Sequence, residues 1–312
     1  MYPKLTYVNY ITPRYWPTWL GLAILRLAAF LPYAAMRFLS HGLTYLVYIG
    51  SPGRKRIAEI NIRLCFPELA ESEVQSMVRE TINSAAMCFF EISLAWWASN
   101  KRMKAMVSFE GVENIEAERK NNRGIILLGG HYTTLEISGR LLTYYMRDFR
   151  PVFKVTRNKL FNTVMVNSRE KAINPLLENS NMRKIISTLK KGVSIWYAPD
   201  QDFGPENSVF APFMGVQTST LLATSRLAKL SGAAVIPFYS ARLGNGKYLI
   251  RFGKSFKDFP SGDDIKDASM INSAIEEHVR QYPEQYLWLH KRFKTRPQGE
   301  PDIYQKKKMR EE

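Results

Sequence analysis

Residues 124–139 read GIILLGGHYTTLEISG, and this stretch decides the class of fold. Its aliphatic residues form a continuous run between glycines, which is typical of a strand buried on both faces of a sheet. His131 follows the end of that run, and residues 134–147 have a helical pattern. A buried strand that leads into a helix favours an α/β fold, in which ligands collect at the carboxyl ends of the strands.

Strand and helix patterns alternate on both sides of this stretch. Further strands are predicted at 107–111, 151–155, 192–200, 233–241 and 247–253, and helices at 71–99, 112–120, 158–173, 181–191, 217–231 and 264–289. The chain has 312 residues, of which 46% are hydrophobic, so it can bury the core of one large domain. We expect a central, mostly parallel or mixed sheet flanked by helices.

The N-terminal region is apolar over a length that suits a membrane. Residues 16–36 read WPTWLGLAILRLAAFLPYAAM, with Arg26 as the single charge, and residues 37–50 continue the apolar character. A bilayer-spanning helix needs about 20 apolar residues, but Arg26 is costly there and Pro32 would kink the helix. The pattern predicts a helical membrane anchor that either spans the bilayer or lies in its interface. The alternative is a pair of buried core helices.

The chain divides at Pro52-Gly53, where a turn signal ends the apolar region. We expect an anchor region at 1–52, a folded body at 53–304 and a charged tail at 305–312. The basic run that begins at Arg54 directly follows the anchor, so the positive-inside rule predicts a body that faces the cytoplasm.

A net charge of +16 restricts the partners of the protein. Nucleic acid, an anionic membrane and acidic soluble molecules all suit such a charge. No zinc-finger spacing or aromatic-basic RNA-binding pattern is present, so we expect no nucleic acid. Cys65 and Cys88 belong to no paired motif, and we expect them to be buried hydrophobic residues, with no metal site.

His131 and Glu136 are the candidate catalytic pair. Residues five apart do not share a helix face, so they can meet only if His131 precedes the helix and folds back over its N-terminus. Glu136 would then accept the Nδ1 proton, and Nε2 would take a proton from a substrate hydroxyl. Thr133 and Thr134 are expected to cap the helix. The alternative from spacing alone is a structural histidine bound to a backbone carbonyl.

Several stretches resemble a known family. GGHYTTLE at 129–136 is similar to the H-x₄-D/E signature of lysophospholipid and glycerolipid acyltransferases. Four further stretches resemble, in order and spacing, the late acyltransferases of lipid A biosynthesis. They are NIRLCFPEL (61–69), LKKGVSIWYAPDQDFGPENSVFAPFMGV (189–216), TSTLLATSRLAKLSGAAVIPF (218–238) and QYLWLHKRFKTRPQGEP (285–301). The resemblance runs from about Trp16 to Tyr304 and is best for the lauroyltransferase branch.

The resemblance implies an enzyme of the inner membrane whose acyltransferase domain, residues 53–304, faces the cytoplasm. It would transfer a fatty acyl chain, lauroyl favoured, from acyl carrier protein to a hydroxyl on an acyl chain of Kdo-bearing lipid IVA, without a cofactor. His131 and Glu136 match the catalytic pair of the family. The positive charge suits an acidic carrier and a phosphorylated acceptor. The alternatives are another phospholipid or glycolipid acyltransferase, or a basic membrane- or nucleic-acid-binding protein without chemistry.

The loop APDQDFG at 198–204 follows a predicted strand. The resemblance implies that Asp200, Gln201 and Asp202 line the active site. Two nearby carboxylates could also bind a metal, which we consider the weaker interpretation. A polar turn stabilised by its own side chains is the remaining alternative.

A second loop carries the candidate cations Lys154 and Arg157. The family usually has Arg-Pro where this chain has Lys154-Val155, so either cation could hold a lipid phosphate or the thioester oxyanion. The alternative is a solvated basic turn. Asn158 and Arg169 match positions that are usually polar and basic in the family, which implies that they also line the site.

Overall fold

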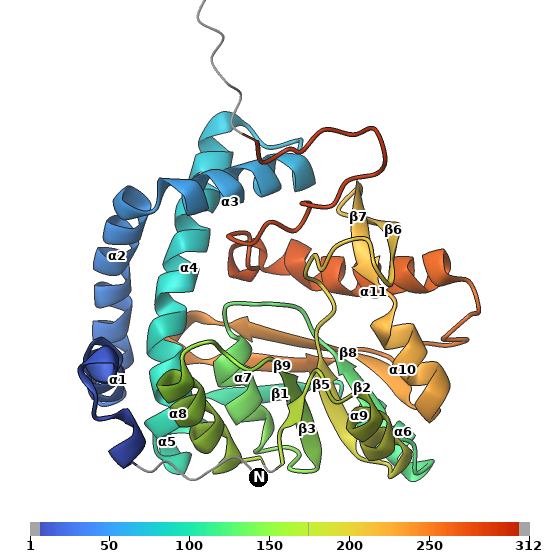
Figure 1. Cartoon of the computed structure of the whole chain (residues 1–312), viewed down its shortest axis with the longest axis horizontal. Coiled ribbons are helices and arrows are strands. Elements are labelled where there is room, and N and C mark those ends of the chain that lie inside the picture. The colour runs from blue at the N-terminus through green and yellow to red at the C-terminus, as the bar shows by residue number, and fades with distance from the viewer. Residues whose placement is uncertain (1–6, 174, 306–312) are drawn as a thin grey trace, which may run out of the picture.

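The computed structural model describes residues 7–173 and 175–305 (Figure 1). Its centre is a seven-stranded sheet in the order β1-β9-β8-β2-β5-β3-β4. The strands are β1 (Val107–Glu110), β2 (Ile125–Leu128), β3 (Phe149–Phe153), β4 (Leu177–Glu178), β5 (Ser194–Tyr197), β8 (Ala234–Arg242) and β9 (Tyr248–Phe252). Neighbouring strands are parallel except β8 and β9, which are antiparallel. The predicted mixed α/β sheet is therefore confirmed.

Helices cover both faces of the sheet (Figure 1). They are α1 (Trp16–Ala28), α2 (Tyr33–Gly50), α3 (Pro52–Cys65), α4 (Glu71–Trp97), α5 (Asn100–Lys104), α6 (Val112–Lys120), α7 (Leu135–Leu142), α8 (Lys159–Glu170), α9 (Met182–Lys190), α10 (Ala223–Ser231) and α11 (Asp264–Gln281). Short 3₁₀ turns lie at Tyr7–Tyr10, Pro13–Tyr15, Gly244–Gly246 and Pro283–Gln285.

Strand β2 explains the continuous apolar run, because its side chains fill two cores. Ile125 and Leu127 belong to a cluster with residues of α4, α7 and α8. Ile126 and Leu128 belong to a second cluster with residues of α3, α9, α10 and α11. All four side chains are at most 1% exposed. A strand between two helical layers needs apolar residues at every position, so alternation is lost.

A hairpin replaces part of one predicted helix. The predicted helix at 217–231 is wrong in its first half, where β6 (Ser208–Phe213) pairs with β7 (Val216–Leu221). Met214 and Gly215 form the turn, and both have positive φ, 51° and 78°. The β-branched residues of β7 suit a strand, and only α10 remains helical.

The last predicted helix is too long. Helix α11 ends at Gln281, whereas the sequence pattern extends to 289. Pro283 opens a 3₁₀ turn two residues later. Proline cannot donate to a continuing helix, and it disfavours the helical conformation in the residue before it. The chain therefore leaves the helix and returns toward the end of β2.

The apolar N-terminal region forms two helices, α1 and α2, with a break at Leu31-Pro32. Both pack on α4 (Figure 1). Arg102 joins this pair to the body, because its guanidinium donates to the Ala29 and Leu31 carbonyls at 2.8 and 2.7 Å. Within the residues that the structure describes, no helix combines the length and hydropathy needed to cross a bilayer. The membrane anchor at 1–52 therefore stays a prediction.

The outer faces of α1 and α2 carry large exposed hydrophobic side chains, whereas Leu22, Leu25 and Met36 on the inner faces are buried. The exposed set is Trp16, Leu20, Ile24, Leu27 and Phe30 with Phe38, Leu39, Tyr45, Leu46 and Ile49. We call these side chains the apolar face. Since they are exposed, the alternative of a buried core helix pair is wrong for this face. Apart from Gln305, the charged tail predicted at 305–312 lies outside the described residues.

Candidate active site

His131 lies between the end of β2 and the start of α7, outside both elements. The two glycines before it are needed because aromatic rings pack against their backbone. A Cβ on Gly129 would lie 2.7 Å from Trp196 Nε1, and one on Gly130 would lie 2.9 Å from the Tyr132 ring. Side chains of the protein itself therefore make the close approach at these two glycines.

Asp200, and not Glu136, holds the His131 ring. His131 Nδ1 is 2.5 Å from Asp200 Oδ1, and the His131 amide donates to Asp200 Oδ2 at 2.8 Å. The predicted contact of Nδ1 with Glu136 is wrong. Asp200 follows β5, which pairs directly with β2, so the ends of two adjacent parallel strands bring the acid to the imidazole. The contact leaves Nε2 for another partner.

His131 and Asp200 each stabilise the charged form of the other. Burial alone would lower the pKa of His131, but the charge and hydrogen bond of Asp200 outweigh burial and raise the pKa above its usual value. Burial would likewise raise the pKa of Asp200, yet His131 and its backbone amide lower that pKa to about 2. Asp200 is therefore ionised, and its charge favours the protonated form of the imidazole.

Glu136 is held by Arg169 and Trp96. Arg169 donates through Nε and Nη2 to the two carboxylate oxygens at 3.0 and 2.5 Å, and Trp96 Nε1 donates to Oε1 at 2.6 Å. Burial would raise the pKa of Glu136, but Arg169 and Trp96 lower it. Glu136 is thus a fixed anion paired with a permanent cation.

The two threonines after His131 do not cap α7 through their side chains. Thr134 is the N-cap residue, but its hydroxyl bonds to the backbone and side chain of Ser240. Thr133 Oγ1 lies 2.7 Å from Ser84 Oγ on α4. The predicted capping role is therefore wrong, and both hydroxyls join the His131 loop to the surrounding elements.

An elongated apolar cavity of about 270 Å³ adjoins His131. Its lining includes His131, Glu136, Lys154 and Arg169. The apolar part of the lining is contributed by Ala95, Trp96, Leu135, Phe149, Pro151, Val152, Phe153, Met165, Ala172, Ile173 and Trp196. The cavity therefore combines an apolar interior with a histidine, a lysine and a part-buried ion pair.

The three candidates of the 154–158 loop differ in whether they line this cavity. Lys154 contributes to the cavity lining, whereas Arg157 is exposed and outside the set of lining residues. Asn158 is the N-cap of α8, because its side chain accepts from the Phe161 amide. The same side chain donates to Thr18 Oγ1 of α1 at 2.8 Å. Asn158 thus joins α8 to the N-terminal helices.

The three candidates of the 200–202 loop have three different positions. Asp200 holds His131, and Gln201 borders a second, small space that His131, His290 and Arg292 also line. Asp202 accepts bonds from the Thr295 amide and hydroxyl at 2.6 and 2.8 Å. Asp202 therefore joins this loop to the C-terminal segment by hydrogen bonds.

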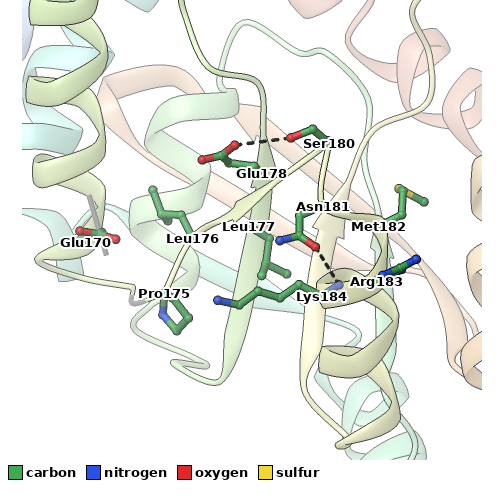
Figure 2. Close-up of a pocket in the computed structure, with 10 residues that line it drawn as sticks. All are labelled: Glu170, Pro175, Leu176, Leu177, Glu178, Ser180, Asn181, Met182, Arg183 and Lys184. Atoms are coloured by element: carbon green, nitrogen blue, oxygen red, sulfur yellow. Dashed lines mark hydrogen bonds between the residues drawn. The ribbon is translucent and has the colours of Figure 1, made fainter. Parts of the chain in front are cut away.

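A larger cavity of about 830 Å³ lies outside this site, beside β4 and the start of α9. Figure 2 shows its mixed polar and apolar lining, in which Asn181 accepts from the Lys184 amide and Ser180 bonds to Glu178. None of the candidate residues lines it. Size alone does not identify the active site, because this groove lacks the buried ionised groups found around His131.

Sequence reasoning missed the contribution of Trp96. It lies near the end of a long helix whose later half is apolar, where an aromatic residue indicates packing rather than a hydrogen bond to Glu136. The role of Asp200 had a signal, since it follows the end of a buried strand as His131 does. That the two strands are neighbours is a long-range fact, which the local pattern does not contain.

Comparisons with known proteins show the family of this chain. The sequence profile of the family described as Bacterial lipid A biosynthesis acyltransferase matches residues 6–295. The chain is 36% identical over 294 residues to the lipid A biosynthesis lauroyltransferase of Escherichia coli K12, covering 94% of this chain and 96% of that protein.

Two further relatives from the same organism have other acyl chains in their names. The palmitoleoyltransferase is 34% identical over 310 residues, covering 97% of this chain and all of that protein. The myristoyltransferase is 31% identical over 298 residues, covering 95% of this chain and 92% of that protein. The names thus agree on acyl transfer in lipid A biosynthesis and differ in the acyl group. The chain belongs to the bacterial lipid A biosynthesis acyltransferase family and is an acyltransferase.

Proposed function

We propose that the protein transfers a fatty acyl chain, lauroyl favoured, from acyl carrier protein to a hydroxyl on an acyl chain of Kdo-bearing lipid IVA. The observation that carries the proposal is the His131 imidazole, held through Nδ1 by buried Asp200 at the edge of an apolar cavity. The similarity to a lauroyltransferase supports the acyl group. The net charge of +16 suits an acidic carrier protein and a phosphorylated acceptor.

His131 acts as the general base in this proposal. Nε2 removes the proton of the acceptor hydroxyl as its oxygen attacks the thioester carbonyl carbon. The tetrahedral intermediate then breaks its carbon–sulfur bond, and the imidazolium returns the proton to the leaving thiolate. The products are an ester and a free thiol. Asp200 stabilises the imidazolium and fixes which nitrogen is free, as the acid of a serine-protease triad does.

The ion pair of Glu136 and Arg169 contributes shape and charge rather than proton transfer. Arg169 donates to both oxygens of Glu136 and, with Trp96, lowers the pKa of this carboxylate, which makes it a weak base. Lys154 supplies a cation to the same cavity without being part of this pair. We assign Lys154 to the developing oxyanion or to an acceptor phosphate, since both are anionic.

The apolar face of α1 and α2 supports a position at the cytoplasmic surface of the inner membrane. Leu20, Ile24 and Leu27 are 65, 52 and 67% exposed and recur at helical spacing along α1. Such a stripe can lie among lipid headgroups without crossing the bilayer. The acceptor is a lipid, so an enzyme at that surface meets it directly. Sedimentation with anionic vesicles tests this position, and replacement of Leu20 and Leu27 by lysine should release the protein.

The function is tested by mass spectrometry of lipid A from cells that lack and then re-express this protein. Deletion should remove the mass of one acyl chain, wild type should restore it, and His131→Ala should not. The Arg157→Ala variant is the matched control, because Arg157 lies outside the cavity lining, and it should restore the mass. An unchanged lipid A profile with altered phospholipids would contradict the proposed acceptor and favour another glycerolipid.

A further inference from the structure

We propose that Gln285 is a positioning residue that fixes His131 against Asp200 without touching the substrate. It does so through residues 285–287, here called the C-terminal strap. The inference rests on the proposed role of His131 as general base. Gln285 follows α11 in the segment that the sequence pattern wrongly assigned to that helix, and it is 3% exposed.

The strap holds the His131 loop through the backbone. Leu287 donates its amide to the His131 carbonyl at 3.0 Å, and the Thr133 amide donates to the Gln285 carbonyl at 2.8 Å. Between them, Tyr132 and Tyr286 form an antiparallel bridge. The His131 carbonyl is thus held by the strap, while its amide is held by Asp200.

The Gln285 side chain joins the strap to the sheet. Its Oε1 accepts from the Arg242 amide at 2.7 Å, and its Nε2 donates to the Arg242 carbonyl at 3.0 Å. Arg242 is the last residue of β8, which lies next to β2 in the sheet. A buried primary amide that satisfies both groups of one backbone residue acts like an added strand residue. The sheet therefore determines where the strap lies.

Arg242 reinforces the same loop through its side chain. Its guanidinium donates to both oxygens of Glu91 at 2.6 and 2.8 Å and to Ser84 Oγ at 3.0 Å. Ser84 Oγ in turn lies 2.7 Å from Thr133 Oγ1. Glu91 is 1% exposed at its side chain, so this network is buried and each member limits the movement of the next.

Loss of the Gln285 bonds should affect catalysis more than substrate binding. The 2.5 Å contact of His131 with Asp200 depends on the position of the His131 backbone, and that contact keeps the pKa of His131 raised. Loosening the strap should therefore slow proton transfer and lower the pKa of His131. Gln285 is not among the residues that line the cavity, so substrate binding should change little.

The test replaces Gln285 by methionine, which has similar volume but cannot bond to Arg242. We expect kcat to fall on the order of tenfold to a hundredfold, as for a misplaced catalytic group, with KM within about twofold. The acid limb of the pH profile should move to lower pH. The matched control is Asp267→Ala at a carboxylate that is 2% exposed and accepts from the Ser261 amide and hydroxyl, since it removes buried bonds far from the strap.

A titration of the His131 imidazole by NMR gives a readout that needs no turnover. Absence of acyl transfer by the wild type would reject the proposed function, and the titration would still test the strap. A Gln285→Met variant with the kcat and imidazole pKa of the control would overturn the proposal. Ser84→Ala, a small change in the same network, should shift both quantities in the same direction but less. An unshifted Ser84→Ala would overturn the proposal where Gln285→Met does not fold.

Discussion

Asp200 is a buried carboxylate and Glu136 a part-buried one at the same site, and they differ in what holds them. Asp200 contacts a histidine, a side chain that can both accept and release a proton. Glu136 contacts Arg169, whose charge is permanent. Only the first pair can take up and return a proton during a reaction. The comparison shows that the acid closest to His131 in the sequence is not the acid that serves it.

The difference follows from where each carboxylate lies in the fold. Asp200 follows β5, next to β2, and so reaches the backbone and ring of His131 together. Glu136 lies in the first turn of α7 and faces α8 and the end of α4. The carboxyl ends of two central strands therefore supply the proton-transfer pair, and the helices on one face of the sheet supply the fixed ion pair.

The largest expected effect separates the two carboxylates. Asp200→Asn keeps the size of the side chain but removes the charge that stabilises the imidazolium. We expect kcat to fall by about 10³–10⁴-fold, as in a triad with the same change. The raised pKa of His131 should fall, so the remaining activity should extend to lower pH. Steady-state kinetics across pH measures both.

The control for this variant is Asp202→Asn, two residues away on the same loop. Asp202 bonds to Thr295 and not to His131, so its replacement should leave the acid limb in place even if the loop is loosened. An acid limb that stays unchanged in Asp200→Asn would contradict the assignment of Asp200 as the partner of His131.

The second effect concerns the fixed pair. Arg169→Met leaves the part-buried Glu136 without its cation. Breaking a fully buried pair in this way costs roughly 3–5 kcal/mol of unfolding free energy, and we expect a smaller loss here. The pKa of Glu136, now lowered by Arg169, should rise. Thermal denaturation and kinetics of the surviving folded protein measure the two consequences.

The double variant Arg169→Met with Glu136→Met sharpens the result, because it removes both charges and should recover much of the lost stability. If Glu136 acted on the substrate proton, the pH profile of Arg169→Met would gain a new limb from the freed carboxylate. An acid limb governed by His131 alone is expected.

The sequence predicted the parts of the site that depend on local pattern. The buried strand, the position of His131 after it and the helix that carries Glu136 are all readable from residues 124–142. The partner of His131 was assigned to the wrong acid because strand order is a long-range property. Two segments separated by about 70 positions become neighbours only when β2 and β5 pair.

Other differences have equally physical causes. Strand β7 was predicted as the start of a helix because it is followed by a real amphipathic helix without a proline between them. The strap was predicted as helix because apolar spacing continues beyond Pro283. In both segments, contacts made far along the chain override the local periodicity.

The smallest expected effect tests the indole bond to Glu136. Trp96→Phe keeps an aromatic ring near Phe161, whose centroid lies 5.5 Å from that of Trp96, but removes the Nε1 donor. A hydrogen bond to a charged group contributes roughly 1.5–3 kcal/mol, yet Glu136 retains both bonds from Arg169. We expect lower thermal stability and a kcat reduced by less than about tenfold. Trp97→Phe is the matched control, since Trp97 does not line the cavity. A loss in Trp96→Phe as large as that in Asp200→Asn would break the comparison, because it would place Glu136 in the proton-transfer step.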